Sequence, residues 1–542
     1  MRPGRRFSER AFLASVFALC LALYLLSAAG RIQGGDDSTM YSLTRNLVER
    51  GEISIVQTVV EVPAQTAAGF LPTRAYEIET VFAVPGRAGK FYCKYGPAQS
   101  LLAVPFYLLG RGVSAFDATH DPQIWTKLCV ALLVNPLISA LGCAALAALA
   151  RQIGASRRAS LLLALLYGFA TLAWAYAKSF FSEPAVALLF LVAALCLARL
   201  HAGHALRDMA LAGACLGAAM LFRATAAIAA PAFIVAAALM LAERRAGWLD
   251  LRRWLAFLAG PLAAAGVILG YNFLRFGAPL STGYAEVAWN TPALAGLYGL
   301  LFSPGKSLFL YAPATLAASA GLPLLWRRSR PLAALTALLS VTYVLFHAPY
   351  NYWSGGWNWG PRFLLPAVPF LVLALAPLLE KGVNGGRVVV GALALTGLLV
   401  TLPAILVDHS RHLIALSERF QSDYYERSIF QPVFSPVVNQ PGVALDVLRR
   451  FAQPQARATM RSILAGAPSI QPANALSLER AGARLVWQDE LLRLNAPDLW
   501  YSHLALCGYI SAGAAGACAG VLAAAVFALA AWTLRTASEE AP

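Results

Sequence analysis

The chain has 542 residues, of which 59% are hydrophobic and 13% are charged, whereas an ordinary soluble domain has roughly 45–50% and about 25%. These proportions exclude a soluble globular protein, a disulfide-rich scaffold and a disordered chain. The formal charge of +16, combined with a mean hydropathy of +0.61, indicates basic cytoplasmic loops of a membrane protein and not a nucleic-acid partner.

Apolar runs long enough to cross a bilayer recur along the chain, since a hydrocarbon core of about 30 Å needs about 20 apolar residues per helix. The first follows several arginines, and we interpret it as a retained span with a cytoplasmic N-terminus, because it ends in no clean cleavage site. The sequence therefore predicts an all-α polytopic membrane protein with about twelve transmembrane helices, at 11–30, 125–149, 160–177, 184–200, 209–222, 226–242, 254–274, 308–326, 331–347, 363–379, 388–407 and 504–534.

A shorter apolar stretch at 97–109 decides the orientation of everything that follows it. If it does not cross, the arginine pairs at 157–158, 244–245, 252–253 and 327–328 lie on the same side as the N-terminus. The positive-inside rule favours this arrangement, and the stretch is also short for a span. We expect 97–109 to lie along the outer membrane surface as a juxtamembrane helix, with both termini in the cytoplasm.

This topology divides the chain into three parts. Residues 1–407 form the transmembrane region, with a large first outer loop at 31–124. The segment 408–502 has mixed charges and several prolines, which predicts a small extracytoplasmic domain. Residues 503–542 supply the final transmembrane helix and a cytoplasmic tail.

Two acidic sites lie at the outer membrane boundary, where an ionisable residue is costly and tends to be functional. Asp36 and Asp37 follow the first span, and Glu183 lies in the very short outer turn before Pro184. Structural roles are also open, since Asp favours the start of a helix and Glu183 could cap a helix or pair with Lys178.

Cations converge on the same face. Arg223 interrupts two apolar runs at their outer ends, where the positive-inside rule disfavours it, so it suits either a buried ion pair or an anion-binding site. The other candidates for binding a phosphate are Lys94, Arg275, Lys306 and Arg362.

Aromatic residues crowd the segment 347–362, which could form an interfacial belt or a loop that approaches a sugar ring. The candidate sugar or acceptor contacts are Tyr41, Tyr95, Trp353, Trp357 and Trp359.

Carboxylates and separate cations beside lipid fit one kind of chemistry well. A transferase that takes sugar from a polyprenyl phosphate needs a carboxylate base to deprotonate an acceptor hydroxyl. It also needs Arg or Lys to hold the leaving phosphate and stabilise its developing charge. A lipid carrier explains a site at the membrane boundary.

The residues of the first outer loop match a known pattern. An acidic pair after the first span, an Arg nine residues after the first Asp and a Gly fifteen after it resemble the GT-C superfamily of integral-membrane glycosyltransferases. The bacterial branch related to protein O-mannosyltransferases and aminoarabinose transferases is the most similar. The matching residues are Asp36-Asp37, Arg45, Gly51, Lys94-Tyr95-Gly96-Pro97 and Glu183-Pro184, whereas Met40 stands where the family has an aromatic residue.

The resemblance implies an inverting transfer with a polyprenyl-phosphate sugar donor, in which Asp36 is the base and Asp37 its companion. It also implies that Lys94, Arg223 and Arg362 bind the lipid phosphate. Some members use a divalent metal ion, for which Asp36, Asp37 and Glu183 could supply oxygen ligands. The acceptor and the sugar are not encoded in any pattern of the sequence.

The strongest alternative is a transporter or flippase of a lipid-linked envelope intermediate, because membrane charges also mark substrate pathways. Transporters place polar groups near the bilayer midplane and show related halves. This sequence keeps its charges at the outer ends of its spans and shows no similarity between its halves, which favours the transferase.

Overall fold

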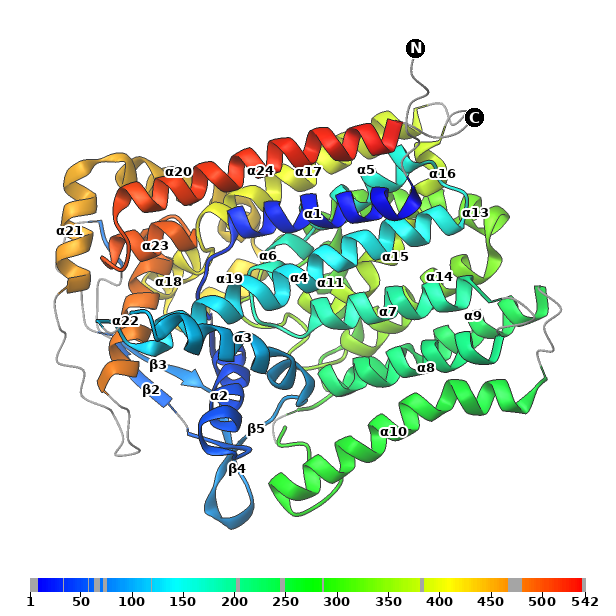
Figure 1. Ribbon diagram of the computed structural model, residues 1–542, viewed down its shortest axis with the longest axis horizontal. Helices are drawn as coiled ribbons and strands as arrows, with labels where there is room; N and C mark the ends of the chain where they lie inside the picture. The colour runs from blue at the N-terminus through cyan, green and yellow to red at the C-terminus, as the bar shows by residue number, and fades with distance from the viewer. Residues whose placement is uncertain are drawn as a thin grey trace.

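The computed structural model of the protein describes residues 8–32, 34–56, 58–62, 69–71, 76–117, 119–200, 205–243, 249–284, 287–380, 385–465 and 480–538. Long apolar helices run side by side through most of the molecule (Figure 1). Among the described residues, eight helical stretches are long and apolar enough to cross a membrane. They are α1 (Glu9–Ser27), α4 (Pro122–Gln152), α8 (Ala205–Phe222), the 3-10 turn η2 (Ala224–Ala229) with α9 (Ala230–Glu243), α10 (Leu251–Phe276), α14 (Arg330–His347), α17 (Gly386–Leu406) and α24 (Ala512–Ser538).

The remaining predicted spans are helical but short or interrupted. Proline lacks the N–H that an inner helical turn needs, and prolines lie in the broken segments that correspond to 308–326 and 363–379. The total of twelve spans stays a prediction. The pieces are α5 (Arg157–Phe169), α6 (Ala173–Ala177), α7 (Glu183–Ala198), α12 (Leu308–Tyr311), η3 (Pro313–Ala317), α13 (Ala318–Arg328), η4 (Arg362–Ala367), α15 (Val368–Leu373) and α16 (Ala376–Leu379).

The start of α1 and the end of α24 lie at the same end of the helix bundle (Figure 1). Helices α1 and α24 pack together there, and the hydroxyls of Ser15 and Thr536 are 3.1 Å apart. Glu9 at the start of α1 forms salt bridges with Arg151 and Arg157 at 3.0 and 3.3 Å. The first and the last described helices therefore begin and end on one side of the bundle. We call the opposite end of the bundle the distal end.

The first outer loop folds at the distal end. It contains α2 (Gly34–Arg50), which stands across the ends of the long helices, and α3 (Ala98–Ser114) (Figure 1). Leu101, Leu102, Leu108 and Leu109 on α3 are exposed, which suits a helix that lies on a membrane surface. Short strands, which the sequence analysis did not predict, form two antiparallel sheets: β1 (Ser54–Ile55), β5 (Phe91–Cys93) and β4 (Ala83–Pro85) in that order, and β2 (Thr58–Val62) with β3 (Tyr76–Val81).

The described parts of the segment 408–502, at 408–465 and 480–502, are largely helical and also lie at the distal end (Figure 1). Part of it has its own apolar cluster, in which Met460, Leu464, Trp487 and Leu491 are buried. Its helices are α18 (Ser410–Phe420), α19 (Tyr424–Phe430), η5 (Pro432–Phe434), α20 (Pro436–Ala452), α21 (Pro454–Ala465), α22 (Arg480–Asn495) and α23 (Trp500–Leu506). Because α24 begins only at Ala512, the final span starts later than the predicted residue 504.

Glycines bring α8 and α10 into close contact. A Cβ atom on Gly213 would lie 1.9 Å from the carbonyl oxygen of Phe257, and one on Gly217 would lie 2.3 Å from that of Gly260. Small residues of this kind let two membrane helices pack backbone to backbone. The contact fixes α10, which carries several residues of the site described below.

We expect Gly213→Ala to destabilise the protein by about 1–3 kcal/mol, because the added methyl group must push the backbone of α10 away. The measurement is the thermal unfolding midpoint in detergent. Gly266→Ala on α10 is the matched control, because a Cβ there meets nothing within 4 Å. A midpoint of the Gly213 variant at or above that of the unaltered protein would contradict the tight contact.

Candidate active site

Asp36 lies in the first turn of α2, where the positive end of the helix dipole favours a carboxylate. Its Oδ2 is 2.8 Å from Nη1 of Arg362, and its Oδ1 accepts a hydrogen bond of 2.5 Å from the Tyr95 hydroxyl. Burial acts to raise the pKa of Asp36, but Arg362 and the Tyr95 hydrogen bond outweigh it and hold the pKa below its ordinary value. Asp36 is therefore ionised at neutral pH.

The Asp37 side chain points away from the partners of Asp36 and is fully buried. Its Oδ2 accepts a hydrogen bond of 2.7 Å from the backbone N–H of Phe180, and its Oδ1 has no partner among the described residues. Burial raises the pKa of Asp37 well above its ordinary value. Since the Asp36 side chain is 19% exposed, Asp36 is the carboxylate of the pair that a substrate can reach.

Glu183 is the first residue of α7 and lies near Arg362, the arginine that binds Asp36. Its Oε1 is 2.8 Å from Nη1 of Arg223 and 4.0 Å from Nε of Arg362. The Glu183 side chain is buried. The alternative in which Glu183 pairs with Lys178 is wrong, because the Lys178 ammonium binds Asp498 at 2.8 Å instead.

Arg362 lies between the two acidic sites and joins them. Its guanidinium packs over the rings of Phe181 and Phe363, both 4.8 Å from the ring centres. Burial acts to lower the pKa of Arg362, but the two carboxylates outweigh it and raise the pKa above its ordinary value. The arginine therefore stays charged. It forms a salt bridge with Asp36, whereas its Nε lies 4.0 Å from Glu183 and has no hydrogen-bond partner among the described residues.

Lys306 holds the aromatic loop at 347–361, which precedes Arg362, through hydrogen bonds to its backbone. The buried Lys306 ammonium donates to the carbonyl oxygens of Gly356, at 2.7 Å, and Asn358. The Tyr425 hydroxyl also donates to the Gly356 carbonyl at 2.7 Å. Burial, followed by the charge of Arg362, lowers the pKa of Lys306 to about 7. In this structure Lys306 supports the loop and does not line the cavity described below.

Several aromatic candidates are packed inside the protein. Trp353 and Trp359 are buried and contact Phe430 and Tyr311, with ring centres 6.1 and 4.9 Å apart. This burial rules out an interfacial belt at these two residues. Trp357 packs on Tyr424 at 5.7 Å. The hydroxyl of the buried Tyr41 lies 2.6 Å from that of Thr126, apart from the hydrogen bonds of Asp36. Tyr95 alone among the aromatic candidates bonds to a candidate catalytic carboxylate.

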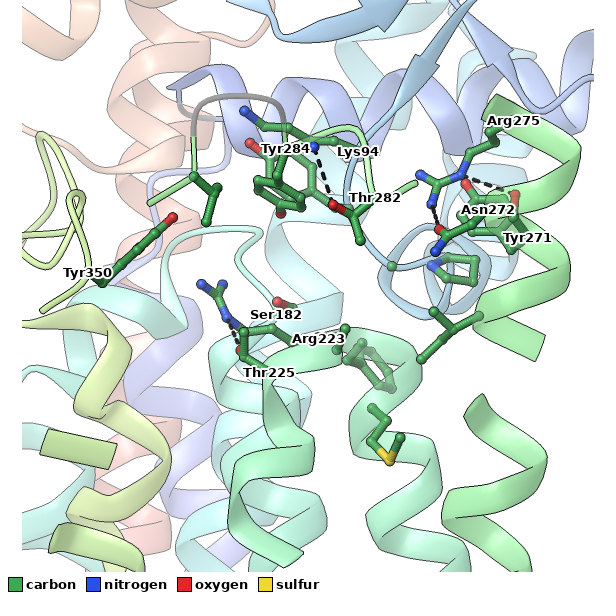
Figure 2. Close-up of a pocket in the computed structure, with 18 of the residues that line it drawn as sticks. Lys94, Ser182, Arg223, Thr225, Tyr271, Asn272, Arg275, Thr282, Tyr284 and Tyr350 are labelled. Atoms are coloured by element: carbon green, nitrogen blue, oxygen red, sulfur yellow. Dashed lines mark hydrogen bonds between the residues drawn. The ribbon is translucent and has the colours of Figure 1, made fainter. Parts of the chain in front are cut away.

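A cavity of about 390 Å³ lies next to this cluster. Figure 2 shows Arg223 and Thr225 on one side of it, Lys94 and Tyr284 opposite them, and Tyr271, Asn272 and Arg275 on α10 at its flank. Tyr95 and Arg223, which contact Asp36 and Glu183, line the cavity as well. The cavity therefore adjoins the carboxylate cluster through Tyr95 and Arg223, whereas Asp36, Glu183 and Arg362 do not line it. Its apolar lining includes Met220, Phe222, Ile268, Trp289 and Phe346.

Lys94 and Arg275 both line the cavity, but they differ in the partners that their charged groups already have. The Lys94 ammonium lies 5.4 to 5.6 Å from the ring centres of Phe82, Tyr95 and Tyr284. Within the described ranges it forms no salt bridge. Arg275 is buried and its guanidinium donates to the carbonyl oxygen of Cys93 and, at 2.7 Å, to Asn272. Lys94 is thus the better placed of the two to bind a new anion.

Most residues of the cavity wall could not be identified from the sequence, and three of them carry hydroxyl groups that face a substrate site. Thr225, Tyr271 and Thr282 come from separate segments and add hydroxyl groups to the wall. Neither spacing nor charge distinguishes a lone Thr or Tyr in a sequence, and these three residues come together only in the folded chain: Thr225 lies in η2, Tyr271 in α10 and Thr282 after α10.

The carboxylates fit arginine better than a metal ion. Calcium and magnesium need several free oxygen ligands, but both oxygens of Asp36 and one of Glu183 already bind Arg362, Tyr95 or Arg223. Among the described residues of this cluster, Oδ1 of Asp37 and Oε2 of Glu183 are the carboxylate oxygens left without a partner. In the part of the chain that the structure describes, no group of three His, Cys, Asp or Glu is placed to hold a metal ion.

No protein-family model and no curated protein sequence matches this chain. Among solved structures, it is similar to ArnT from Cupriavidus metallidurans bound to undecaprenyl phosphate, with 13% identity, a TM-score of 0.45, and coverage of 92% of this chain and 78% of that one. It is also similar to the archaeal oligosaccharyltransferase AglB from Archaeoglobus fulgidus in complex with an inhibitory peptide and a dolichol-phosphate, with 14% identity and a TM-score of 0.42. That likeness covers 87% of this chain and 61% of AglB. The structures of both proteins contain a lipid phosphate.

Proposed function

We propose that the protein is a membrane glycosyltransferase. It moves a sugar from a polyprenyl-phosphate donor to a hydroxyl acceptor on the outer face of the membrane, with inversion at the anomeric carbon. The observation that carries the proposal is the accessible, ionised Asp36, which Arg362 and Tyr95 hold beside a cavity lined by Lys94 and Arg223.

The cluster supplies the groups that the reaction needs. The Asp36 carboxylate takes the proton of the acceptor hydroxyl as the acceptor oxygen attacks the anomeric carbon. The bond from that carbon to the phosphate oxygen breaks, and its electron pair stays on the phosphate. Lys94 and Arg223 stabilise the charge that develops there. The products are an inverted glycoside, a polyprenyl phosphate and a protonated Asp36.

The position of the cavity supports a lipid-linked donor. Its apolar wall includes Met220 and Phe222 at the end of α8 and Ile268 on α10. The outward side of α10 is exposed at Leu262, Val267 and Phe273, which indicates a helix that faces lipid. A phosphate at Lys94 would therefore lie within reach of a polyprenyl chain in the bilayer.

Purified protein incubated with a panel of polyprenyl-phosphate sugars and hydroxyl acceptors tests the proposal. We expect release of free polyprenyl phosphate with at least one donor, and product with the opposite anomeric configuration. Retention of configuration would contradict direct attack by the acceptor. Failure with every donor, together with movement of the lipid across liposome membranes, would favour the transporter.

A further inference from the structure

A second cluster of buried charges lies outside the cavity and joins three distant parts of the chain. Arg31 follows the first span, Lys178 precedes α7, and Asp408 and Asp498 belong to the segment 408–502. Arg31 binds Asp408 at 2.9 Å and Asp498 at 2.8 Å, and Lys178 binds Asp498 at 2.8 Å. All four side chains are at least 95% buried.

Each cation of this cluster precedes one of the acidic sites by five residues. Arg31 comes before Asp36, and Lys178 comes before Glu183. Asp498 accepts hydrogen bonds from both cations, with two from Arg31 at 2.8 and 3.1 Å. A single carboxylate of the outer segment thus reaches the bases of both acid-bearing loops.

Several hydrogen bonds hold the backbone of the loop from Lys178 to Glu183 in place. Gln99 donates to the carbonyl oxygen of Phe180 at 3.1 Å, and Asn135 donates to that of Phe181 at 2.9 Å. The N–H of Phe180 donates to Asp37. The remaining end of the loop is held by the Lys178 ammonium, which donates to the carboxylate and the backbone carbonyl oxygen of Asp498 and to the carbonyl oxygen of Ile405. Two of these three bonds tie the loop of Glu183 to a residue more than 300 positions away.

We propose that Asp498, assisted by Asp408, is a positioning residue of the active site, which gives the segment 408–502 a role in catalysis. Through Lys178 and Arg31 it holds the loops that carry Glu183 and Asp36 at the separation that Arg362 bridges. It does not touch the substrate. The effect on catalysis rests on the proposed function, whereas the effect on the loops does not.

The test compares Asp498→Asn with Asp446→Asn. Asp446 is a half-exposed carboxylate of the same segment, paired with Arg450 on α20, and serves as the control. We expect Asp498→Asn to lower kcat at least tenfold, with a change of less than threefold in the KM for the donor. Asp446→Asn should leave both constants unchanged. A folded Asp498 variant with wild-type kcat would overturn the proposal.

Hydrogen–deuterium exchange separates this inference from the proposed function. In Asp498→Asn, the amides of residues 178–183 and 34–41 should exchange at least tenfold faster than in the unaltered protein, whether or not any sugar donor is turned over. Unchanged exchange in both loops would overturn the positioning role. Faster exchange in a protein that transfers no sugar would retain the role and reject the transferase.

A double variant removes the concern that an unpaired buried cation simply unfolds the protein. Lys178→Gln with Asp498→Asn deletes both charges of the pair and keeps side chains of similar size. If positioning is the cause, kcat stays low in the double variant although its thermal midpoint recovers. Return of kcat to the wild-type value would show that the uncompensated charge, and not the lost link, was responsible, and would overturn the proposal.

Discussion

Asp36→Asn is expected to lower kcat for sugar transfer by about 10²–10⁴-fold, which is the usual contribution of a positioned general base. The amide has nearly the shape of the carboxylate and can still accept the hydrogen bond from Tyr95, but it cannot take the acceptor proton. The donor should bind almost as before, because Lys94 and Arg223 are unchanged. The measurement is the initial rate of polyprenyl phosphate release at saturating donor.

Two variants make this result interpretable. Asp423→Asn removes an exposed carboxylate that pairs with Arg427, and its rate should equal that of the unaltered protein. Asp37→Asn removes a buried carboxyl whose Oδ2 accepts a backbone hydrogen bond, so it should mainly lower stability. Wild-type kcat in a folded Asp36→Asn protein would reject Asp36 as the base.

The pH dependence of this assignment has a defined sign. The pKa of Asp36 lies below its ordinary value, and an ordinary Asp titrates near 3.9. The carboxylate is therefore ready to accept a proton throughout the neutral range, and the rate should not fall as the pH drops from about 8 to about 5. A loss of rate with a midpoint near neutral pH would point to a different base.

Lys94→Gln is expected to weaken binding of polyprenyl phosphate by about ten- to a hundredfold, since a hydrogen bond to a charged group contributes roughly 1.5–3 kcal/mol. Lys94 lies on the cavity wall and, within the described residues, makes no salt bridge that would compete for its ammonium group. Both the KM for the donor and the dissociation constant of the product lipid should rise. Titration of the purified protein with polyprenyl phosphate measures the second quantity without turnover.

The control for this variant lies four residues earlier in the chain. Lys90 is half-exposed and pairs with Glu52 at 3.0 Å, outside the cavity. Lys90→Gln removes the same charge from the same outer loop, so it should leave lipid binding unchanged. Equal losses in both variants would mean that Lys94 acts only through the general charge of the protein surface.

Charge at the membrane boundary was enough to identify the core of the candidate site from sequence. Asp36, Glu183, Arg223 and Arg362 each break the usual pattern at the end of an apolar run, and the structure brings all four together. Lys306 breaks the same pattern but turns toward loop carbonyls. Charge shows where burial is costly, but it does not show which partner offsets the cost.

The apolar helices of the fold were predictable from the sequence, but their interruptions and the strands were not. Hydropathy located the apolar helices because each needs its own run of about 20 residues. It could not predict where prolines divide a run, as in the pieces from Leu308 to Arg328. Nor could it predict the strands, because a strand as short as Ser54–Ile55 carries no periodic pattern. The link from Lys178 to Asp498 was also invisible, since no local rule joins residues so far apart.

The contacts of Asp498 with Arg31 and Lys178 also bear on the order of events during synthesis of the chain. A ribosome adds about 5–20 residues per second, so roughly tens of seconds separate the synthesis of Glu183 from that of Asp498. During this interval Arg31 and Lys178 have emerged without the carboxylate that both bind in the finished protein. The nascent chain thus inserts nearly all of its membrane helices before its two acidic loops can be locked.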